Sequence, residues 1–340
     1  MNPNRIRIIL ILIAIIFTAQ ACDLLLGTES GSGSQGVFVS VDSGDTWQAG
    51  NAKGDLDLAS SAVSRLYIEG SKPQNIVAAS INAGLLASDD HGANWARLLP
   101  DFTAHDAFIN PYDGQEIFAA GARGRTAAIY KSPDRGRTWI QVYNEPTGQF
   151  SVTVLAFDRT NSQVMYAGLS SGTVLKSADG GDTWNALVSF EGRVADLAAT
   201  RSMVYSLTLT SGIKRSTDSG RSWSNLSFSQ SANTFNDLYA DPGSESILYV
   251  AASSGLYQTQ DTGTTWTKLP VPASPEIANV TAVAVNPAKK SQIFAAIRST
   301  IYRSEDAGAT WRTVQLPTNR TITDIVIDPF EPNRIYAGLR

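Results

Sequence analysis

The chain has 340 residues, a formal net charge of −4 at pH 7 and only 17% charged residues. A mildly acidic chain is a poor partner for nucleic acid, which proteins bind through clustered Lys and Arg. Cys22 is the only cysteine, which excludes an internal disulfide and a metal site of several cysteines, and we expect neither a metal nor a cofactor.

The first 35 residues are predicted to direct and anchor the protein rather than to fold. In residues 1–21 a basic start precedes an apolar run, Ile8–Phe17, which is shorter than the roughly 20 residues of a membrane-spanning helix. The small residues Ala19 and Ala21 then precede Cys22, and this segment resembles the lipobox of bacterial lipoproteins. The resemblance implies a signal peptide over 1–21, a lipidated Cys22 and a Gly/Ser-rich tether over 22–35. We therefore expect an extracytoplasmic protein anchored to a bacterial membrane, with a plain secretory peptide as the alternative.

Seven copies of one turn motif, S/T-x-D-x-G-x-T/S/N-W, follow between residues 36 and 340. They contain every tryptophan of the chain: Trp47, Trp95, Trp139, Trp184, Trp223, Trp266 and Trp311. Consecutive tryptophans are 39 to 48 residues apart, a period typical of propeller blades. A carboxylate can accept hydrogen bonds from backbone N–H groups just ahead of it, and Gly permits a positive φ, so the motif is expected to be a hairpin corner. Its acidic residues are then structural: Asp42, Asp90, Asp134, Asp179, Asp218, Asp261 and Asp306.

Each repeat is predicted to contain four strands, which we name A to D. Alternating apolar runs indicate strands, Asn/Asp-Pro pairs such as Asn286-Pro287 mark the A–B turn, and the Asp motif marks the C–D turn. The folded region begins at Gly36–Ser40 as a C strand, and Ile335–Arg340 reads as a B strand. Pairing of the two ends in one composite blade would close the ring and leave no open edge. We therefore predict an all-β, seven-bladed β-propeller over 36–340, present as a monomer and essentially without helix.

The seven motifs resemble Asp-boxes, also called bacterial neuraminidase repeats (BNR). These occur in sialidases, oligoxyloglucan-acting glycosidases, sortilin-type receptors and photosystem II assembly factors. The resemblance covers residues 36–340 and implies that the boxes face away from any active site. Binding or chemistry is then expected on the opposite face, formed by the B–C and D–A connections, which we call the rim face.

Four acidic residues of the rim connections are candidates for glycoside hydrolysis, which uses two carboxyl groups: Asp101, Glu145, Glu191 and Glu276. A sialidase would also carry a Phe/Tyr-Arg-Ile/Leu-Pro segment before its first box, whereas Phe38 is followed here by Val-Ser. We expect a non-catalytic protein, with an exo-acting glycosidase, sialidase-like or β-glucan-acting, as the alternative.

Six arginines are predicted to occupy neighbouring sectors of the rim: Arg65, Arg123, Arg125, Arg298, Arg320 and Arg340. A basic sector can bind an anionic group or an acidic protein surface, although ordinary solvated charges are an alternative. Photosystem assembly factors, which the chain resembles, also carry an arginine patch on a lipid-anchored seven-bladed propeller, so a chaperone of that type is a further alternative. The main prediction is a binding or assembly scaffold for a membrane or envelope protein or a surface glycan.

A polar position recurs at the start of strand A: Asp106, Asp196, Asp237 and Asp324, with Arg65 in the first blade. These carboxylates either ring the channel mouth and bind a cation or each cap their own B–C turn through backbone N–H groups. His91 lies inside the second box and His105 stands alone on the rim, so no histidine-based metal site is expected.

Overall fold

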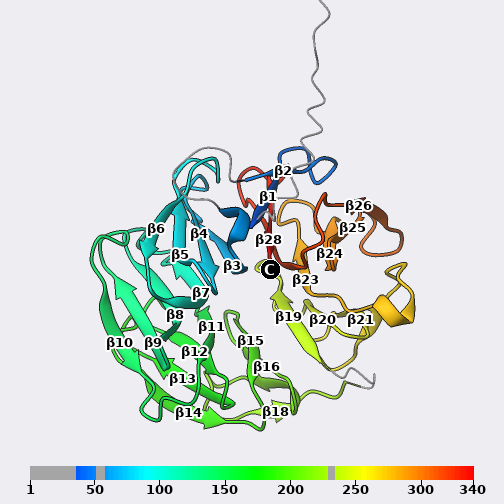
Figure 1. Cartoon of the computed structure of the whole chain (residues 1–340). Helices are drawn as coiled ribbons and strands as arrows, with labels where there is room; N and C mark the ends of the chain where they lie inside the picture. The colour runs from blue at the N-terminus through cyan, green and yellow to red at the C-terminus, as the bar shows by residue number, and fades with distance from the viewer. Residues whose placement is uncertain (1–35, 51–57, 229–233) are drawn as a thin grey trace, which may run out of the picture. The chain divides into compact units, whose positions relative to one another are not determined.

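The computed structural model describes residues 36–340 except 51–57 and 229–233. The expected signal peptide, the lipidation site Cys22 and the tether lie outside the described residues. The described residues form 28 strands and two short 3-10 helices, η1 (Leu58–Ser60) and η2 (Pro275–Ile277), and contain no helix long and apolar enough to cross a membrane. The strands make seven four-stranded antiparallel sheets arranged around a central axis, so the predicted seven-bladed β-propeller is confirmed (Figure 1).

Each blade contains its four strands in the order A to D. Blade one is β3 (Val63–Ile68), β4 (Ile76–Ser80), β5 (Gly84–Ser88) and β6 (Ala96–Leu99). Blade two is β7 (Thr103–Ile109), β8 (Ile117–Arg123), β9 (Thr126–Ser132) and β10 (Ile140–Asn144). Blade three is β11 (Val152–Phe157), β12 (Met165–Leu169), β13 (Thr173–Ser177) and β14 (Asn185–Ser189). Blade four is β15 (Val194–Ala199), β16 (Val204–Thr208), β17 (Gly212–Ser216) and β18 (Ser224–Asn225). Blade five is β19 (Phe235–Ala240), β20 (Leu248–Ala252), β21 (Gly255–Thr259) and β22 (Thr267–Leu269). Blade six is β23 (Ala282–Val285), β24 (Ile293–Ile297), β25 (Thr300–Ser304) and β26 (Arg312–Gln315). Blade seven is β27 (Ile322–Ile327), β28 (Ile335–Leu339), β1 (Val37–Ser40) and β2 (Gln48–Ala49).

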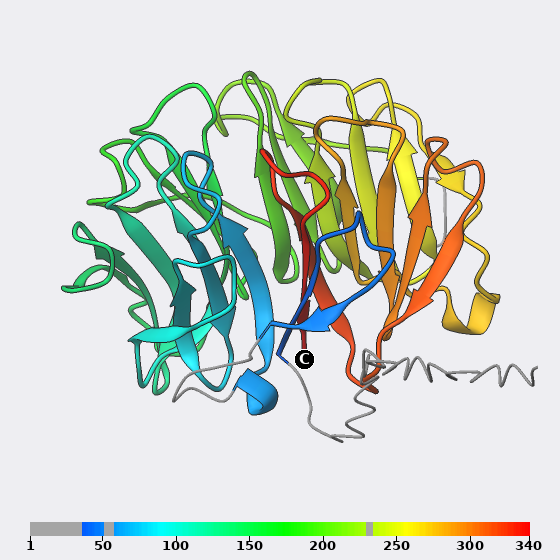
Figure 2. The same ribbon diagram turned by 90° about the horizontal axis from the view of Figure 1, so that it is seen from above.

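The A strands surround the axis, because each contacts the A strands of both neighbouring blades. Each B strand lies between strands A and C of its own blade, and every residue of β12, β20 and β24 is buried. Burial on both faces explains why these strands read as unbroken apolar runs rather than as alternating ones. The D strands are the most exposed, and β14 has no fully buried residue. Figure 2 shows the strands running between the two faces, with both 3-10 helices on the same face as Arg340.

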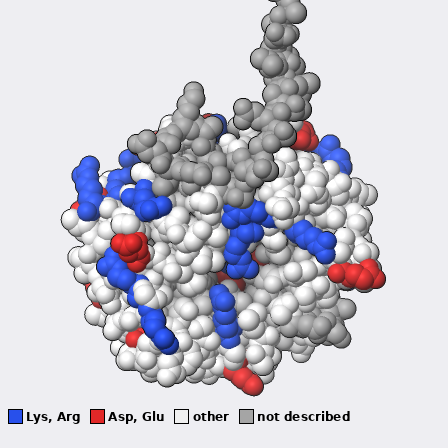
Figure 3. Space-filling view, in the orientation of Figure 1, with Lys and Arg blue, Asp and Glu red and all other residues white. Residues whose placement is uncertain are grey.

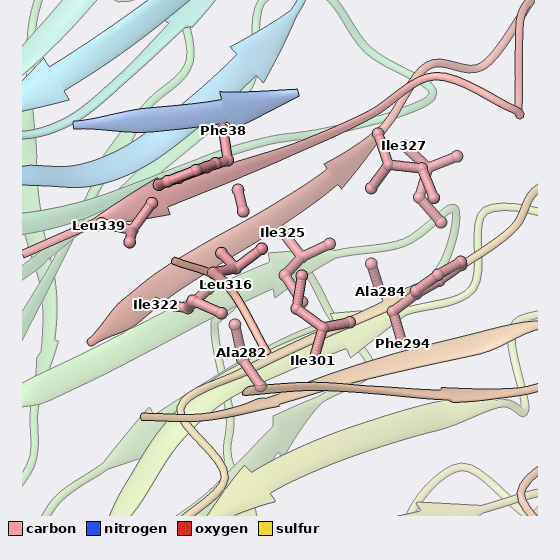
Figure 4. Close-up of a cluster of buried hydrophobic side chains, with 13 residues drawn as sticks. Phe38, Ala282, Ala284, Phe294, Ile301, Leu316, Ile322, Ile325, Ile327 and Leu339 are labelled. Carbon is pink, nitrogen blue, oxygen red and sulfur yellow. The ribbon is translucent and has the colours of Figure 1, made fainter. Parts of the chain in front are cut away.

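Blade seven joins the two ends of the described chain. Strand β1 pairs with β28 in antiparallel register, with Phe38 opposite Ala337. The Phe38 ring, 2% exposed, packs in one cluster with Ile325 and Leu339 of its own blade and with Phe294 of blade six (Figure 4). Burying a side chain of this size contributes about 2–3 kcal/mol. The composite blade therefore closes the ring both through a strand ladder and through packing against the preceding blade.

Candidate functional site

The Asp-box carboxylates are engaged inside their own turns. In the first box, the backbone N–H of Thr46 donates to Asp42 Oδ1 at 2.9 Å and its hydroxyl donates to Oδ2 at 2.6 Å. The N–H of Gly44 donates to Ser40 Oγ at 2.8 Å, and the Trp47 indole donates to the Gly44 carbonyl at 3.2 Å. Burial opposes ionisation, but the hydrogen bonds from Thr46 and Ser40 outweigh it and lower the pKa of Asp42 to about 2. An ionised, fully bonded carboxylate of this kind holds a turn and has no proton to give to a substrate.

The propeller axis contains a buried ion cluster centred on Arg65. Its Nη2 lies 2.8 Å from Asp196 Oδ2, and its Nη1 lies 2.9 Å from Asp237 Oδ1 and 3.8 Å from Asp324 Oδ1. The three carboxylate side chains are only 6–8% exposed. Arg65, which the sequence pattern placed among the rim arginines, therefore lies inside the channel and is committed to these partners.

The channel carboxylates also connect neighbouring blades. In each case one Oδ2 atom accepts a backbone N–H from the A strand of the next blade around the ring: Leu155 to Asp106 at 2.7 Å, Leu238 to Asp196 at 2.9 Å, Val283 to Asp237 at 2.9 Å and Leu66 to Asp324 at 2.7 Å. The sequence predicted backbone N–H donors for these groups but placed them in the B–C turn of the same blade, which is wrong. In the described part of the chain, no group of three or more His, Cys, Asp or Glu side chains could hold a metal ion.

Four carboxylates surround a single guanidinium in this cluster: Asp106, Asp196, Asp237 and Asp324. Burial raises the pKa of Asp106 to about 6, against the attraction of Arg65. Burial raises the pKa of Asp196 and of Asp324 to about 7, again with Arg65 opposing the shift. Close to neutral pH, part of this cluster therefore carries protons.

On the rim side of the cluster, the A strands form a polar channel mouth. In most A strands the pairing with strand B skips one residue, just before the position that Arg65 occupies in blade one. The skipped residue, for example Ser64 or Thr153, lines the mouth. Thr153 Oγ1 lies 3.0 Å from the carbonyl oxygen of Gly168 and 2.7 Å from that of Val194 in the next blade. Its proton is thus committed to the backbone. Ser64, Thr281 and Thr323 are bonded in the same way.

The mouth opens into a pocket of about 200 Å³ that three further basic side chains line: His105, Arg193 and Arg340. Burial lowers the pKa of His105 to about 4, and the positive charges of Arg193 and Arg340 add to the effect. Burial and the neighbouring Arg340 lower the pKa of Arg193. The sequence patterns did not single out Arg193. Arg193 stands two residues before Ala195, the residue of β15 that lines the mouth. At the position equivalent to Arg193 the other repeats have small polar residues or Ala, such as Thr103, Ser151 and Thr321.

The remaining rim arginines have different environments. Arg123 lies over the Tyr130 ring, 5.2 Å from its centroid, and Arg125 is exposed in the following turn. Arg298 is exposed in the β24–β25 connection with a φ of 55°. Arg320 donates to the backbone carbonyl of Ser61 at 2.6 Å and therefore ties blade seven to blade one. Figure 3, which looks onto the rim face, shows Lys and Arg side chains near its centre and the larger acidic patches toward its margin.

The four candidate catalytic carboxylates lie in four different D–A connections, and no hydrogen bond or ion pair joins any two of them in the described structure. Glu145 is buried and accepts hydrogen bonds from the hydroxyl of Thr147 and the N–H of Gln149. These bonds lower its pKa although burial opposes them. A hydrogen bond from Ser274 lowers the pKa of Glu276, at the start of η2. Asp101 and Glu191 are exposed.

No family model matches the chain. A xyloglucanase of Hypocrea jecorina (strain QM6a) is 27% identical to it over 179 residues, which are 48% of this chain but 20% of that enzyme. The GH74 xyloglucanase structure from Xanthomonas campestris has a TM-score of 0.70 and 18% identity, covering 82% of this chain and 51% of its own. A structure of YCF48 bound to D1 peptide has a TM-score of 0.63 and 16% identity, covering 82% of this chain and 94% of its own. The chain thus spans only part of the xyloglucanases that it matches, and the structural likeness establishes the propeller fold alone.

Proposed function

We propose that this chain is a lipid-anchored, extracytoplasmic propeller that binds a partner at its rim face and performs no chemistry there. One observation carries the proposal: basic side chains gather around the channel mouth, while the rim carboxylates are scattered over separate connections. An acidic surface of a membrane or envelope protein complements this face in charge. A surface glycan is the alternative partner, and a neutral glycan would not complement this charge.

The carboxylates support a binding role over a hydrolytic one. A glycosidase needs two carboxyl groups roughly 5–10 Å apart, one of them with a raised pKa so that it can donate a proton. The pKa of Glu145 is lowered instead, because its own turn supplies hydrogen bonds to the ionised form. The carboxyl groups with raised pKa values, such as Asp196, lie in the channel and hold backbone N–H groups of the next blade. Neither set offers a free acid beside a free base.

The structural comparison supports the same proposal. YCF48 is a propeller of nearly the same extent as this chain, and its structure was solved with a peptide bound. The fold at this size is therefore compatible with peptide recognition. A peptide or protein surface that carries acidic groups would find its counter-charges at Arg298 and Arg340 of this rim.

Paired charge reversals test the proposal. The variant Arg298→Glu/Arg340→Glu changes the rim, and the matched variant Arg137→Glu/Arg221→Glu changes two exposed arginines of the Asp-box turns on the other face. Arg320 is left unchanged because its guanidinium bonds the backbone. After crosslinking in membranes, the rim variant should recover much less partner than the parent, and the box-face variant should recover as much. Equal recovery by all three proteins would refute binding through the basic rim.

Glycoside hydrolysis is the second candidate function, and the sequence match to a xyloglucanase is the observation that favours it. The assay is release of reducing ends from xyloglucan, β-glucan oligomers and a sialoside, with Glu145→Gln and Glu191→Gln as the decisive variants. The binding proposal expects no turnover by the parent. Turnover that either variant abolishes would replace the binding proposal with the enzymatic one.

A further inference from the structure

The pocket at the channel mouth is lined by positive charge from three separate elements. Arg65 forms its floor from β3, Arg193 enters from the β14–β15 connection, and Arg340 follows β28, while His105 of β7 completes the wall. No Asp or Glu is among the described residues that line it. The other polar wall groups are hydroxyls such as those of Thr153 and Thr323, whose protons go to backbone carbonyls.

Two of these guanidinium groups form no ion pair within the described structure. Arg65 is balanced by the channel carboxylates, but the guanidinium groups of Arg193 and Arg340 form no ion pair and no side-chain hydrogen bond with any described residue. They lie close enough to repel each other, and their charges add to the burial that lowers the pKa of His105. Both side chains are exposed, and like charges held close together cost free energy unless an anion joins them.

We infer that the channel mouth binds a phosphate-type oxyanion. Two guanidinium groups without ion-pair partners attract an anion such as phosphate, and Arg donors match its geometry. The donors approach from different blades, which suits a tetrahedral group with oxygens on several sides better than a planar carboxylate. The neutral imidazole of His105 can add one N–H donor. The phosphate comes either from inorganic phosphate or from the monoester headgroup of a lipid, and the inference needs no protein partner at the rim.

The two histidines of the chain give a direct readout by NMR, because His91 lies in an Asp-box turn and serves as an internal control. Titration with inorganic phosphate should move the ring resonances of His105 and raise its pKa, since a bound anion stabilises the imidazolium ion. The resonances of His91 should stay in place. Acetate should produce the same change only at much higher concentration.

Substitutions then assign the response to the pocket. Each of Arg193→Gln and Arg340→Gln should weaken phosphate binding by at least about tenfold, as expected for the loss of a charged hydrogen-bond donor. The control Arg221→Gln, at an exposed box-face arginine, should leave the phosphate affinity unchanged. Unaltered His91 resonances report that each variant is folded.

A flotation assay separates the two sources of phosphate. The full chain carrying Cys22→Ser is mixed with phosphatidylcholine vesicles with or without phosphatidic acid, a lipid phosphomonoester. Flotation with phosphatidic acid that inorganic phosphate competes away, and that Arg193→Gln abolishes, assigns the headgroup. A response of His105 to inorganic phosphate without flotation assigns free phosphate. The inference is overturned if His105 does not respond, if acetate binds as tightly as phosphate, or if the Arg193 and Arg340 variants bind as well as the parent.

Discussion

Replacing Arg65 with methionine should destabilise the propeller strongly, because it leaves the channel carboxylates without their only described cation. The guanidinium contacts Asp196 and Asp237 at 2.8 and 2.9 Å, and these carboxylates are 6% and 7% exposed. Removing one partner of a buried ion pair costs about 3–5 kcal/mol, since the remaining charge stays buried and uncompensated. Arg65 itself is 23% exposed, which places the expected loss near the lower end of that range.

The size of this loss should depend on pH in a defined direction. Below about pH 5 the channel carboxyl groups with raised pKa values are already protonated, so the substitution leaves less uncompensated charge than at higher pH. At about pH 8 these groups are ionised in the parent, and the methionine side chain would offer them no counter-charge, so the loss should be at its largest.

Urea unfolding at both pH values, followed by tryptophan fluorescence, measures the difference between the parent and Arg65→Met. The control Arg193→Met removes a nearby arginine that has no described ion pair and should change the unfolding free energy by less than about 0.5 kcal/mol. Equal unfolding midpoints for the parent and Arg65→Met at pH 8, or an equal loss at both pH values, would refute the proposed role of the cluster.

Three further predictions concern the fold. The parent should be most stable near about pH 4–5, for two reasons. The channel carboxyl groups have folded pKa values of about 6 to 7, above the ordinary 3.8, so their contribution to stability is lost as the pH rises. The box carboxylates with pKa values of about 2 contribute stability that is lost as the pH falls below about 4. A stability maximum at pH 8 in urea unfolding would contradict this. Gly181→Ala should cost about 1–3 kcal/mol more than Gly212→Ala, because both have a positive φ but only at Gly181 would the new Cβ lie 2.4 Å from the Phe118 ring; equal losses on thermal unfolding would refute the packing argument. Deletion of residues 322–340 removes both inner strands of blade seven and should give aggregation or a broad melt, whereas a soluble product with an unchanged cooperative transition would refute ring closure.

The sequence predicted the architecture because its signals are local and repeated. Each Trp lies at a fixed distance from its Asp, so the number of blades could be counted, and the strand fragments at Gly36 and Arg340 showed how the ring closes. The partners in the channel could not be predicted in this way. Asp324 and Leu66 are 258 residues apart, and only the closed ring brings them within 2.7 Å.

The rim was predicted less well because side-chain direction depends on register and on local turns. A shift in register between Val63 and Arg65 accompanies the placement of the Arg65 guanidinium in the channel. Glu145 was read as an open rim carboxylate, yet it bonds to Thr147 two residues ahead, a local capping pattern that was present in the sequence. Arg193 could have been found by aligning the repeats, because it replaces a small residue at one fixed position.

Site-specific photocrosslinking in cells tests the central claim, that the rim face binds a partner, most directly. A photoreactive amino acid at Arg298, on the rim, is compared with one at Arg221, on the Asp-box face, both exposed in the structure. The account predicts a discrete crosslinked species from position 298 and none from position 221. A crosslinked species from position 221 alone, with none from position 298, would contradict the account.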